Sequence, residues 1–233
     1  MQQRAPQNDL DQVWIVVPAY NEAGAIGPVL HAVLDVFPRV LVVDDCSNDH
    51  TGDLSASAGA TVLRHPINLG QGAALQTGID YALAQGAEIV VTFDADGQHS
   101  VADAVAMVRL LRETRCDLIL GSRFLGAAPN MSWRKRLLLR AATLYTRLTT
   151  GLDVSDTHNG LRVLSRRAAE RIRISQDRMA HASEILTQVA VQKLSYREAP
   201  CTISYTKYSM AKGQPLSGSL TILRDLVVRR LYR

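Results

Sequence analysis

Two carboxylates directly follow an apolar run near the middle of the chain. Residues 89–93 are Ile-Val-Val-Thr-Phe, which indicates a buried strand, and Asp94, Asp96 and Gln98 come next. In an alternating α/β chain, side chains at the carboxyl end of a strand lie at the edge of the sheet where ligands bind. Hard oxygen ligands of this kind suit Mg²⁺ or Mn²⁺, and such ions are usually shared with substrate phosphates. An Asp-rich turn without a ligand is the alternative interpretation.

The same chemistry recurs after other expected strands. Residues 18–22 (Pro-Ala-Tyr-Asn-Glu) follow the first strand, and Asp44 and Asp45 end the second. Carboxylates there can accept hydrogen bonds from a nucleobase or a ribose. Gly70 and Gly72 open a helix, where glycines let backbone N–H groups approach a phosphate or a sugar closely. Each segment alone could be an ordinary turn, but together they favour a nucleotide site.

The elements expected to position these residues alternate along the chain. We predict strands at 13–18, 40–43, 61–64, 89–93 and 118–120 and helices at 22–36, 49–59, 70–85 and 100–113, with Asn21 and Ser100 as helix caps. This order predicts an α/β fold with a mostly parallel central sheet and helices on both faces. After residue 121 the pattern changes, and we expect a basic amphipathic helix at 133–149, strands at 160–164 and 196–205, and a helix at 182–192 between those strands.

The composition is typical of a globular protein, with 233 residues of which 47% are hydrophobic and 21% charged. We expect a polar tail at 1–12, one main domain at 13–213 and a basic amphipathic helix at 214–233. No stretch approaches 18 uninterrupted apolar residues and the first residues lack an apolar signal core, so we expect a cytoplasmic protein. Three cysteines, far apart in the chain, favour reduced thiols over disulfides or a zinc site.

The net charge of +4 is unevenly distributed. Residues 123–151 contain no acidic side chain, and their basic residues are Arg123, Arg134, Lys135, Arg136, Arg140 and Arg147. A basic excess is typical of proteins that bind phosphate-rich ligands, anionic membranes or nucleic acid, and a solvated basic face is the alternative. No nucleic-acid-binding module is recognisable and only 5% of residues are aromatic, so we expect no nucleic-acid partner.

Seven motifs between about residues 13 and 212 resemble those of family 2 glycosyltransferases with the GT-A fold, a Rossmann-like fold of nucleotide-diphospho-sugar transferases. The resemblance is to the branch that makes dolichyl-phosphate and polyprenyl-phosphate sugars. The motifs are Pro-Ala-Tyr-Asn-Glu (18–22), Val-Val-Asp-Asp-Cys-Ser-Asn-Asp-His-Thr (42–51), Asn-Leu-Gly-Gln-Gly (68–72), Asp-Ala-Asp-Gly-Gln-His (94–99), Gly-Ser-Arg-Phe (121–124), Asp-Thr-His-Asn-Gly-Leu-Arg (156–162) and Ser-Glu-Ile-Leu-Thr-Gln (183–188).

This resemblance implies a set of site residues. A UDP- or GDP-linked sugar would be held by Pro18, Ala19, Tyr20, Glu22, Asp44, Asp45, Gly70, Asp94 and Ala95. Mg²⁺ or Mn²⁺ would be bound by Asp94, Asp96 and Gln98, and would stabilise the leaving nucleoside diphosphate. A polyprenyl phosphate would face Arg123, Arg134, Lys135, Asn159, Arg162, Lys207 and Lys212. The catalytic residues would be Asp96, Arg123 and Glu184.

We expect the acceptor to be a polyprenyl phosphate, and a sugar hydroxyl of a glycan or lipid-linked glycan is the alternative. Relatives of this kind invert the anomeric centre by single displacement, and a polyprenyl phosphate at the cytosolic membrane face is already an anion that needs no general base. A sugar hydroxyl of a glycan does need one. In that alternative Glu184 is the base, although many hydroxyl-glycosylating relatives carry Glu-Asp where this chain has Ser183-Glu184. A non-catalytic nucleotide-sugar-binding protein is the third alternative.

Two predicted helices have an apolar face and a basic face. In the first, the apolar face is formed by Trp133, Leu137, Ala141, Leu144, Tyr145 and Leu148. The second lies at 218–233. Such helices can lie in the interface of an anionic membrane. Packing of the same faces on the domain, or on a second subunit of a homodimer, is the alternative.

Overall fold

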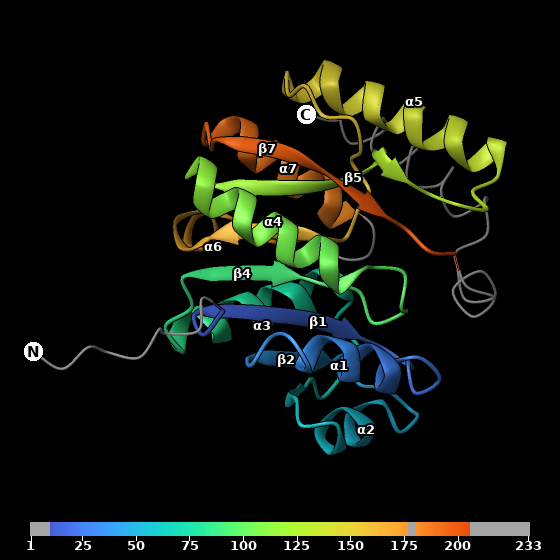
Figure 1. Cartoon of the computed structure of the whole chain (residues 1–233), viewed down its shortest axis with the longest axis vertical. Coiled ribbons are helices and arrows are strands. Elements are labelled where there is room, and N and C mark those ends of the chain that lie inside the picture. The colour runs from blue at the N-terminus through green and yellow to red at the C-terminus, as the bar shows by residue number, and fades with distance from the viewer. Residues whose placement is uncertain (1–9, 177–179, 206–233) are drawn as a thin grey trace, which may run out of the picture.

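A seven-stranded sheet forms the centre of the computed structural model, which describes residues 10–176 and 180–205 (Figure 1). The strands are β1 Val13–Ala19, β2 Val40–Asp44, β3 Thr61–Arg64, β4 Ile89–Thr92, β5 Leu118–Ala127, β6 Arg162–Ser165 and β7 Tyr196–Thr202. The helices are α1 Ile26–Leu34, α2 Thr51–Ser57, α3 Gln71–Ala84, α4 Val101–Thr114, α5 Trp133–Thr150, α6 Arg166–Arg171 and α7 Ala180–Val191. The strand order is β3-β2-β1-β4-β6-β5-β7, and only β6 runs antiparallel to its neighbours. This confirms the predicted α/β class.

Alternate residues of the buried strands face two different apolar cores. In β1, Val13, Ile15 and Val17 pack into the core that includes α1 and α4, whereas Trp14 and Val16 pack into the core that includes α3, α6 and α7. Strands buried on both faces are expected to be continuously apolar, as these are. The helices therefore cover both faces of the sheet (Figure 1).

The reversed direction of β6 determines where the site forms. Its first residue, Arg162, pairs with Thr92 at the end of β4 and with Leu120 of β5. The chain entering β6 therefore lies at the same edge as the chain leaving β1, β2 and β4. Segments far apart in the sequence meet at this one edge.

Some element boundaries differ from the predictions. Helix α1 begins at Ile26, not at residue 22, and Asn21 does not cap it. Asn21 has a left-handed backbone (φ 54°) and donates its N–H to Ser47 Oγ, while the N–H of Glu22 bonds Thr51 Oγ1. These bonds to the loop after β2 replace the first helical turn. Ser100 does cap α4, by accepting the N–H of Asp103.

Two further differences lie after residue 118. Strand β5 extends to Ala127, with an irregular register between Ser122 and Ala127, and the short helix α6 was not predicted. Most of the predicted polar tail and the helix predicted at 214–233 lie outside the described residues. Within the described part, none of the helices has the length and apolar character needed to cross a membrane.

Candidate active site

Asp44 ends β2, and only one of its two carboxylate oxygens accepts a hydrogen bond from the described residues. It is 1% exposed, and its Oδ1 accepts the N–H of Ser47 at 2.9 Å. Its Oδ2 has no hydrogen-bond partner among the described residues, although Arg64 Nε lies 3.5 Å away. A Cβ at residue 52 would lie 2.8 Å from Oδ2, so Gly52 leaves room beside this oxygen. A buried acceptor without a partner is costly, so this oxygen is suited to an N–H group of a ligand.

Asp45, by contrast, uses both oxygens to order the loop at 65–70. Oδ1 lies 2.7 Å from His65 Nδ1 and accepts the N–H of Leu69 at 2.9 Å, and Oδ2 accepts the N–H of Gly70 at 2.7 Å. The Gly70 N–H that was expected to face the donor is therefore taken by Asp45. Asp45 and Gly70 therefore fix the shape of the loop at 65–70.

The loop after β1 is fastened to the loop after β2. Pro18 and Ala19 are buried at the end of β1, and the Ala19 carbonyl accepts the N–H of Asp45 at 2.9 Å. Tyr20, which is 42% exposed, and Glu22 follow on the loop itself. The structure thus brings the predicted donor residues of the first two strands together.

Asp94 lies where β4, α3 and the loop before β6 meet. Its Oδ2 lies 2.8 Å from His99 Nε2, and its Oδ1 accepts a hydrogen bond from the Gln71 side chain at 3.3 Å. Burial would raise the pKa of Asp94, but the charge and hydrogen bond of His99, with two more distant basic side chains, bring that pKa below its ordinary value. A Cβ at residue 160 would lie 2.2 Å from Asp94 Oδ2, so this contact requires Gly160.

Asp96 and Gln98 share one short turn with the buried Ala95. The N–H of Gln98 bonds Asp96 Oδ1 at 3.0 Å, and its side-chain amide contacts Oδ2. Burial first, and then the negative charge of Asp94, raise the pKa of Asp96. Because the charge of Asp94 disfavours the ionised form of Asp96, a divalent cation held by both carboxylates would favour that form, so these residues fit a metal.

Asp94, Asp96 and Gln98 do not complete the coordination shell of a divalent cation by themselves. In the described part of the chain, no three His, Cys, Asp or Glu side chains gather to hold a metal by themselves. A cation bound to Asp94, Asp96 and Gln98 would therefore complete its shell with substrate or water oxygens, as Mg²⁺ usually does.

The loop before β6 clamps Arg123, a β5 residue that is 8% exposed. The guanidinium donates from Nε to Asp156 Oδ2 at 2.6 Å, from Nη2 to the carbonyl of His158 at 2.6 Å and from Nη1 to the Tyr205 hydroxyl at 3.1 Å. Burial would lower the pKa of Arg123, but the charge of Asp156 raises it above its ordinary value. Arg123 is therefore a fixed, fully charged group.

Burial disfavours positive charge on two basic side chains beside this clamp, Arg162 and His158. Burial lowers the pKa of Arg162 to about 10, although the charges of Asp94 and Asp156 oppose the shift. Burial also lowers the pKa of His158 to about 4; the charge of Asp156 opposes this shift, and the smaller effects of the Arg162 and Arg123 charges add to it. An anion bound here would offset both effects.

The other residues predicted for the acceptor lie in different surroundings. Asn159 is buried. Its side-chain N–H donates to Cys201 Sγ at 2.8 Å, and its Oδ1 accepts the N–H of Leu161 at 3.0 Å. Lys135 Nζ lies 4.2 Å from the ring centroid of Tyr205, whereas the exposed Arg134 lies over Trp133. Lys207 and Lys212 lie outside the described residues.

Glu184 lies on α7, and its carboxylate holds the end of the loop that precedes α7. Its oxygens accept the N–H groups of Ser175 at 3.0 and 3.2 Å and of Gln176 at 2.9 Å, and the hydroxyl of Ser175 at 2.5 Å. Both oxygens therefore have protein partners. This arrangement fits a loop-binding residue better than a general base.

Sequence reasoning missed Asp156, His99, Tyr205 and Glu198. Asp156 and His99 lie inside the recognised motifs 156–162 and 94–99, so their positions were marked but not their partners. Glu198 Oε1 accepts the N–H groups of residues 155 and 156, which fixes the loop that carries Asp156. Its partners are more than 40 positions away, and no local pattern indicates them.

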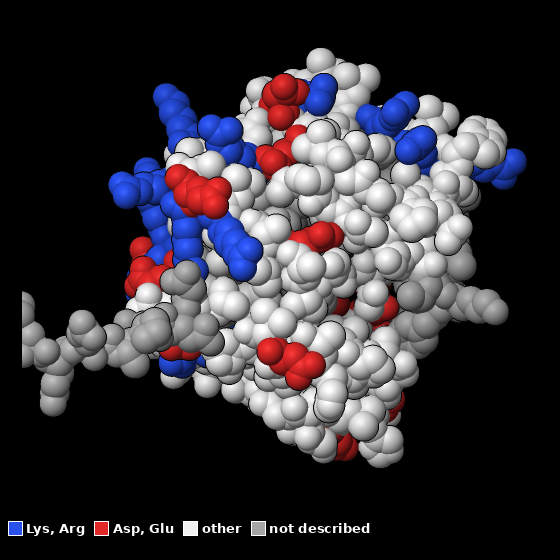
Figure 2. Space-filling view, viewed as in Figure 1, with Lys and Arg blue, Asp and Glu red and all other residues white. Residues whose placement is uncertain are grey.

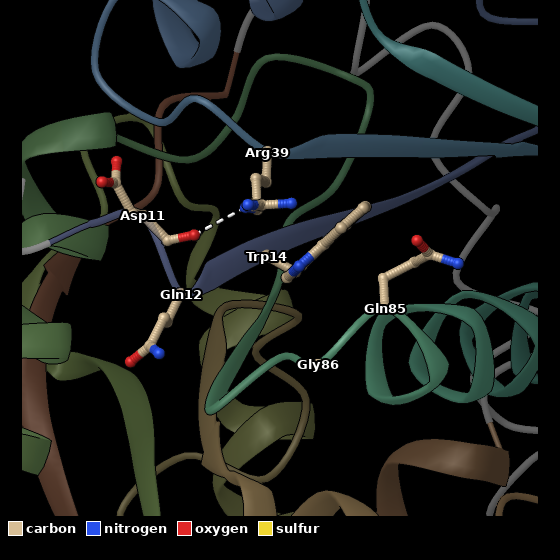
Figure 3. Close-up of a pocket in the computed structure, with 6 residues that line it drawn as sticks. All are labelled: Asp11, Gln12, Trp14, Arg39, Gln85 and Gly86. Carbon is tan, nitrogen blue, oxygen red and sulfur yellow. Dashed lines mark hydrogen bonds between the residues drawn. The ribbon is translucent and has the colours of Figure 1, made fainter.

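A pocket at the opposite edge of the sheet is distinct from this site (Figure 3). It is lined by Asp11, Gln12, Trp14, Arg39, Gln85 and Gly86, near the amino ends of β1 and β2. Arg39 donates to the Asp11 carbonyl at 2.6 Å and lies over the ring of Trp14. These groups satisfy one another, so the pocket adds nothing to the chemistry described above.

Comparison with known proteins matches residues 14–173 to the family described as Glycosyl transferase family 2. The UDP-N-acetylglucosamine–dolichyl-phosphate N-acetylglucosaminyltransferase of Methanococcus voltae is 29% identical, over 94% of this chain and 96% of that protein. The polyprenol monophosphomannose synthase of Mycolicibacterium smegmatis is 31% identical, over 88% of this chain and 81% of that protein.

Among solved structures, glucosyl-3-phosphoglycerate synthase of Mycobacterium tuberculosis has a similar fold. Its complex with Mn²⁺, UDP and phosphoglyceric acid superimposes with a TM-score of 0.70 at 19% identity, over 93% of this chain and 78% of that one. At this identity the likeness shows the fold alone, which is the GT-A fold.

Proposed function

This chain belongs to glycosyl transferase family 2, and we propose that it moves a sugar from a nucleoside-diphosphate sugar to a polyprenyl phosphate, with inversion. The names of the two relatives, one acting on dolichyl phosphate and one making a polyprenol monophosphosugar, support a lipid phosphate as acceptor. The single observation that favours a phosphate acceptor over a sugar hydroxyl is that Glu184 is already hydrogen-bonded within the protein. Its carboxylate is already bonded to Ser175 and Gln176, and a phosphate nucleophile needs no general base.

The donor base would lie against the carboxyl end of β2. Asp44 Oδ2, buried and without a hydrogen bond from the described residues, is suited to accept the ring N–H that both uracil and guanine carry. Asp45 would act one step away, by holding the loop at 65–70 in shape. Tyr20 and Glu22, on the loop fastened beside Asp44, would flank the nucleoside.

The donor diphosphate would lie near the turn at 94–98. Asp94, Asp96 and Gln98 would hold Mg²⁺ or Mn²⁺, which supplies positive charge to the leaving diphosphate. The complex of the solved neighbour with Mn²⁺ and UDP supports a divalent cation as the cofactor. His99 would keep the Asp94 carboxylate ionised and oriented.

The acceptor phosphate would be balanced by the cations around Arg123. In the reaction, a phosphate oxygen attacks the anomeric carbon, and the bond from that carbon to the donor's β-phosphate oxygen breaks with its electron pair going to the nucleoside diphosphate. Arg123 is suited to orient the attacking phosphate because Asp156 and His158 already fix its plane. Arg162 would add charge from the interior.

A membrane surface is the expected place of reaction, and α5 supports it. The buried side of α5 carries Thr143 and Thr146, while Trp133 is 70%, Leu137 62%, Leu144 58% and Leu148 76% exposed. Basic side chains lie among uncharged ones along one half of this helix, at the upper right of Figure 2. An exposed apolar stripe flanked by cations is suited to an anionic lipid interface, here the inner face of the membrane.

The test is a transfer assay with the purified full-length chain. Undecaprenyl or dolichyl phosphate would be presented in detergent with Mn²⁺ and a series of UDP- and GDP-sugars. We expect a lipid-linked monosaccharide with one of these donors, and Glu184→Gln should keep most of the activity. Transfer to a glycan hydroxyl, abolished by Glu184→Gln, would contradict the proposal and favour the alternative.

A further inference from the structure

We infer that Tyr205 is a positioning residue for the acceptor phosphate, because its one side chain contacts both Arg123 and Lys135. This inference rests on the proposed function, since it takes the acceptor to be a phosphate. The two cations come from different elements, β5 and α5, and these elements also meet where Arg140 of α5 lies over the ring of Phe124 of β5, 6.0 Å from its centroid. Tyr205 follows β7, the strand that pairs with β5.

The hydroxyl of Tyr205 completes a three-point hold on the guanidinium. Arginine has five N–H groups, and Asp156, His158 and Tyr205 each take one, from Nε, Nη2 and Nη1 respectively. Nη1 and Nη2 each keep one further N–H, to which no described residue is hydrogen-bonded. A guanidinium with a fixed plane and two N–H groups to spare is prepared for an anion, because little side-chain freedom is lost on binding.

The ring of Tyr205 holds the second cation. Lys135 Nζ lies 4.2 Å from the ring centroid, in the geometry of a cation–π contact. The ring itself is half-buried and packs against the core that contains α1 and α4. Lys135 would otherwise be a long side chain on an exposed helix, with considerable rotamer entropy to lose on binding a phosphate.

Tyr205 also joins the exposed helix to the buried clamp. Through this ring, α5 and the Arg123 clamp share one contact, so the phosphate end of a lipid seated along α5 would meet Lys135 and Arg123 together. The alternative is that Tyr205 only closes the edge of the core. The two accounts differ in what the hydroxyl does, because the core needs only the ring.

Two substitutions separate these accounts. Tyr205→Phe removes the hydroxyl and keeps the ring, and Tyr205→Leu removes both. In steady-state assays with undecaprenyl phosphate, we expect Tyr205→Phe to raise the acceptor KM about tenfold, with kcat and the donor KM changed less than about twofold. Tyr205→Leu should raise the acceptor KM by a further two- to fivefold. Tyr81→Phe, at the Trp14 contact near the opposite edge, is the matched control and should change neither constant.

A double-mutant cycle tests the link to Lys135. Lys135→Met should raise the acceptor KM strongly in the wild-type and Tyr205→Phe backgrounds, and weakly in Tyr205→Leu, where the ring is absent. If the wild type transfers sugar to undecaprenyl phosphate while Tyr205→Phe matches it in acceptor KM, or if the cycle of Lys135→Met with Tyr205→Leu is additive, the inference is wrong and the proposed function stands. If the wild type uses no polyprenyl phosphate with any donor, the proposed function is wrong and the inference is wrong with it.

Discussion

The ion pair between Asp156 and Arg123 should contribute strongly to stability, and Asp156→Asn tests this. Asp156 Oδ2 accepts two N–H groups of Arg123, at 2.6 Å from the side chain and 3.1 Å from the backbone, and both residues are less than 10% exposed. Removing one partner of a buried pair leaves an uncompensated charge, which costs about 3–5 kcal/mol. We expect about 3 kcal/mol for Asp156→Asn, because the amide oxygen can still accept one bond.

For a chain of this size, 1 kcal/mol shifts the melting temperature by about 2–4 °C, so Tm should fall by about 6–12 °C. The assay is thermal unfolding followed by circular dichroism, without nucleotide or metal. Asp153→Asn is the control on the same loop, because the ion pair of Asp153 with Arg147 is largely exposed and should shift Tm by less than about 2 °C.

The double variant Asp156→Asn/Arg123→Met completes this prediction. It removes both charges and should recover most of the lost stability. A melting temperature of Asp156→Asn within about 2 °C of the wild type, or a double variant less stable than either single one, would refute the reasoning.

Three other predictions follow from the site and from α5. Asp96→Asn should reduce transfer at least about 100-fold without lowering the melting temperature of the metal-free protein, because it removes a metal ligand and also relieves repulsion with Asp94; activity and Tm measurements check both effects. Asp44→Asn should weaken nucleoside-diphosphate binding roughly tenfold in calorimetry, whereas Asp45→Asn should mainly lower Tm by loosening the loop at 65–70. Leu137→Gln combined with Leu144→Gln should weaken co-sedimentation with anionic vesicles at least tenfold at unchanged Tm, and Val191→Gln, 75% exposed on α7, should leave co-sedimentation unaltered.

The sequence was a good guide wherever a local pattern decides the structure. The apolar runs of β1, β2 and β4 predicted the sheet, and the carboxylates that follow them do lie together at one edge of it. Ser100 was predicted correctly as a cap because capping depends on residues three positions apart. Asn21 was not, since its conformation depends on Ser47 and on the loop after β2.

The clamp around Arg123 could not be predicted for the same reason. Asp156 is 33 positions from Arg123, and Tyr205 is 82 positions away. Such contacts follow from strand order, and in particular from the antiparallel insertion of β6 between β4 and β5. Periodicity showed that α5 is two-sided, but only the packing of Thr143 and Thr146 against the domain determined that its apolar side is the exposed one.

The pKa shifts distinguish two halves of the site, one that favours a bound cation and one that favours a bound anion. At Asp96, burial and the charge of Asp94 disfavour a second negative charge, so this half is suited to a cation. Around Arg162 and His158, burial disfavours positive charge although the neighbouring carboxylates oppose it, so this half is suited to a further anion. Asp94 acts on both halves, since its charge raises the pKa of Asp96 and opposes the lowering of that of Arg162.

This division matches the charge movement of the proposed reaction. As the acceptor phosphate forms its bond to the sugar, it gives up negative charge, while the departing nucleoside diphosphate gains negative charge beside the metal. The half that favours an anion would therefore bind the acceptor before transfer, and the half that favours a cation would stabilise the leaving group during transfer. A sugar hydroxyl carries no charge and would not offset the burial of the positive charge on Arg162, which is the electrostatic reason to prefer a phosphate.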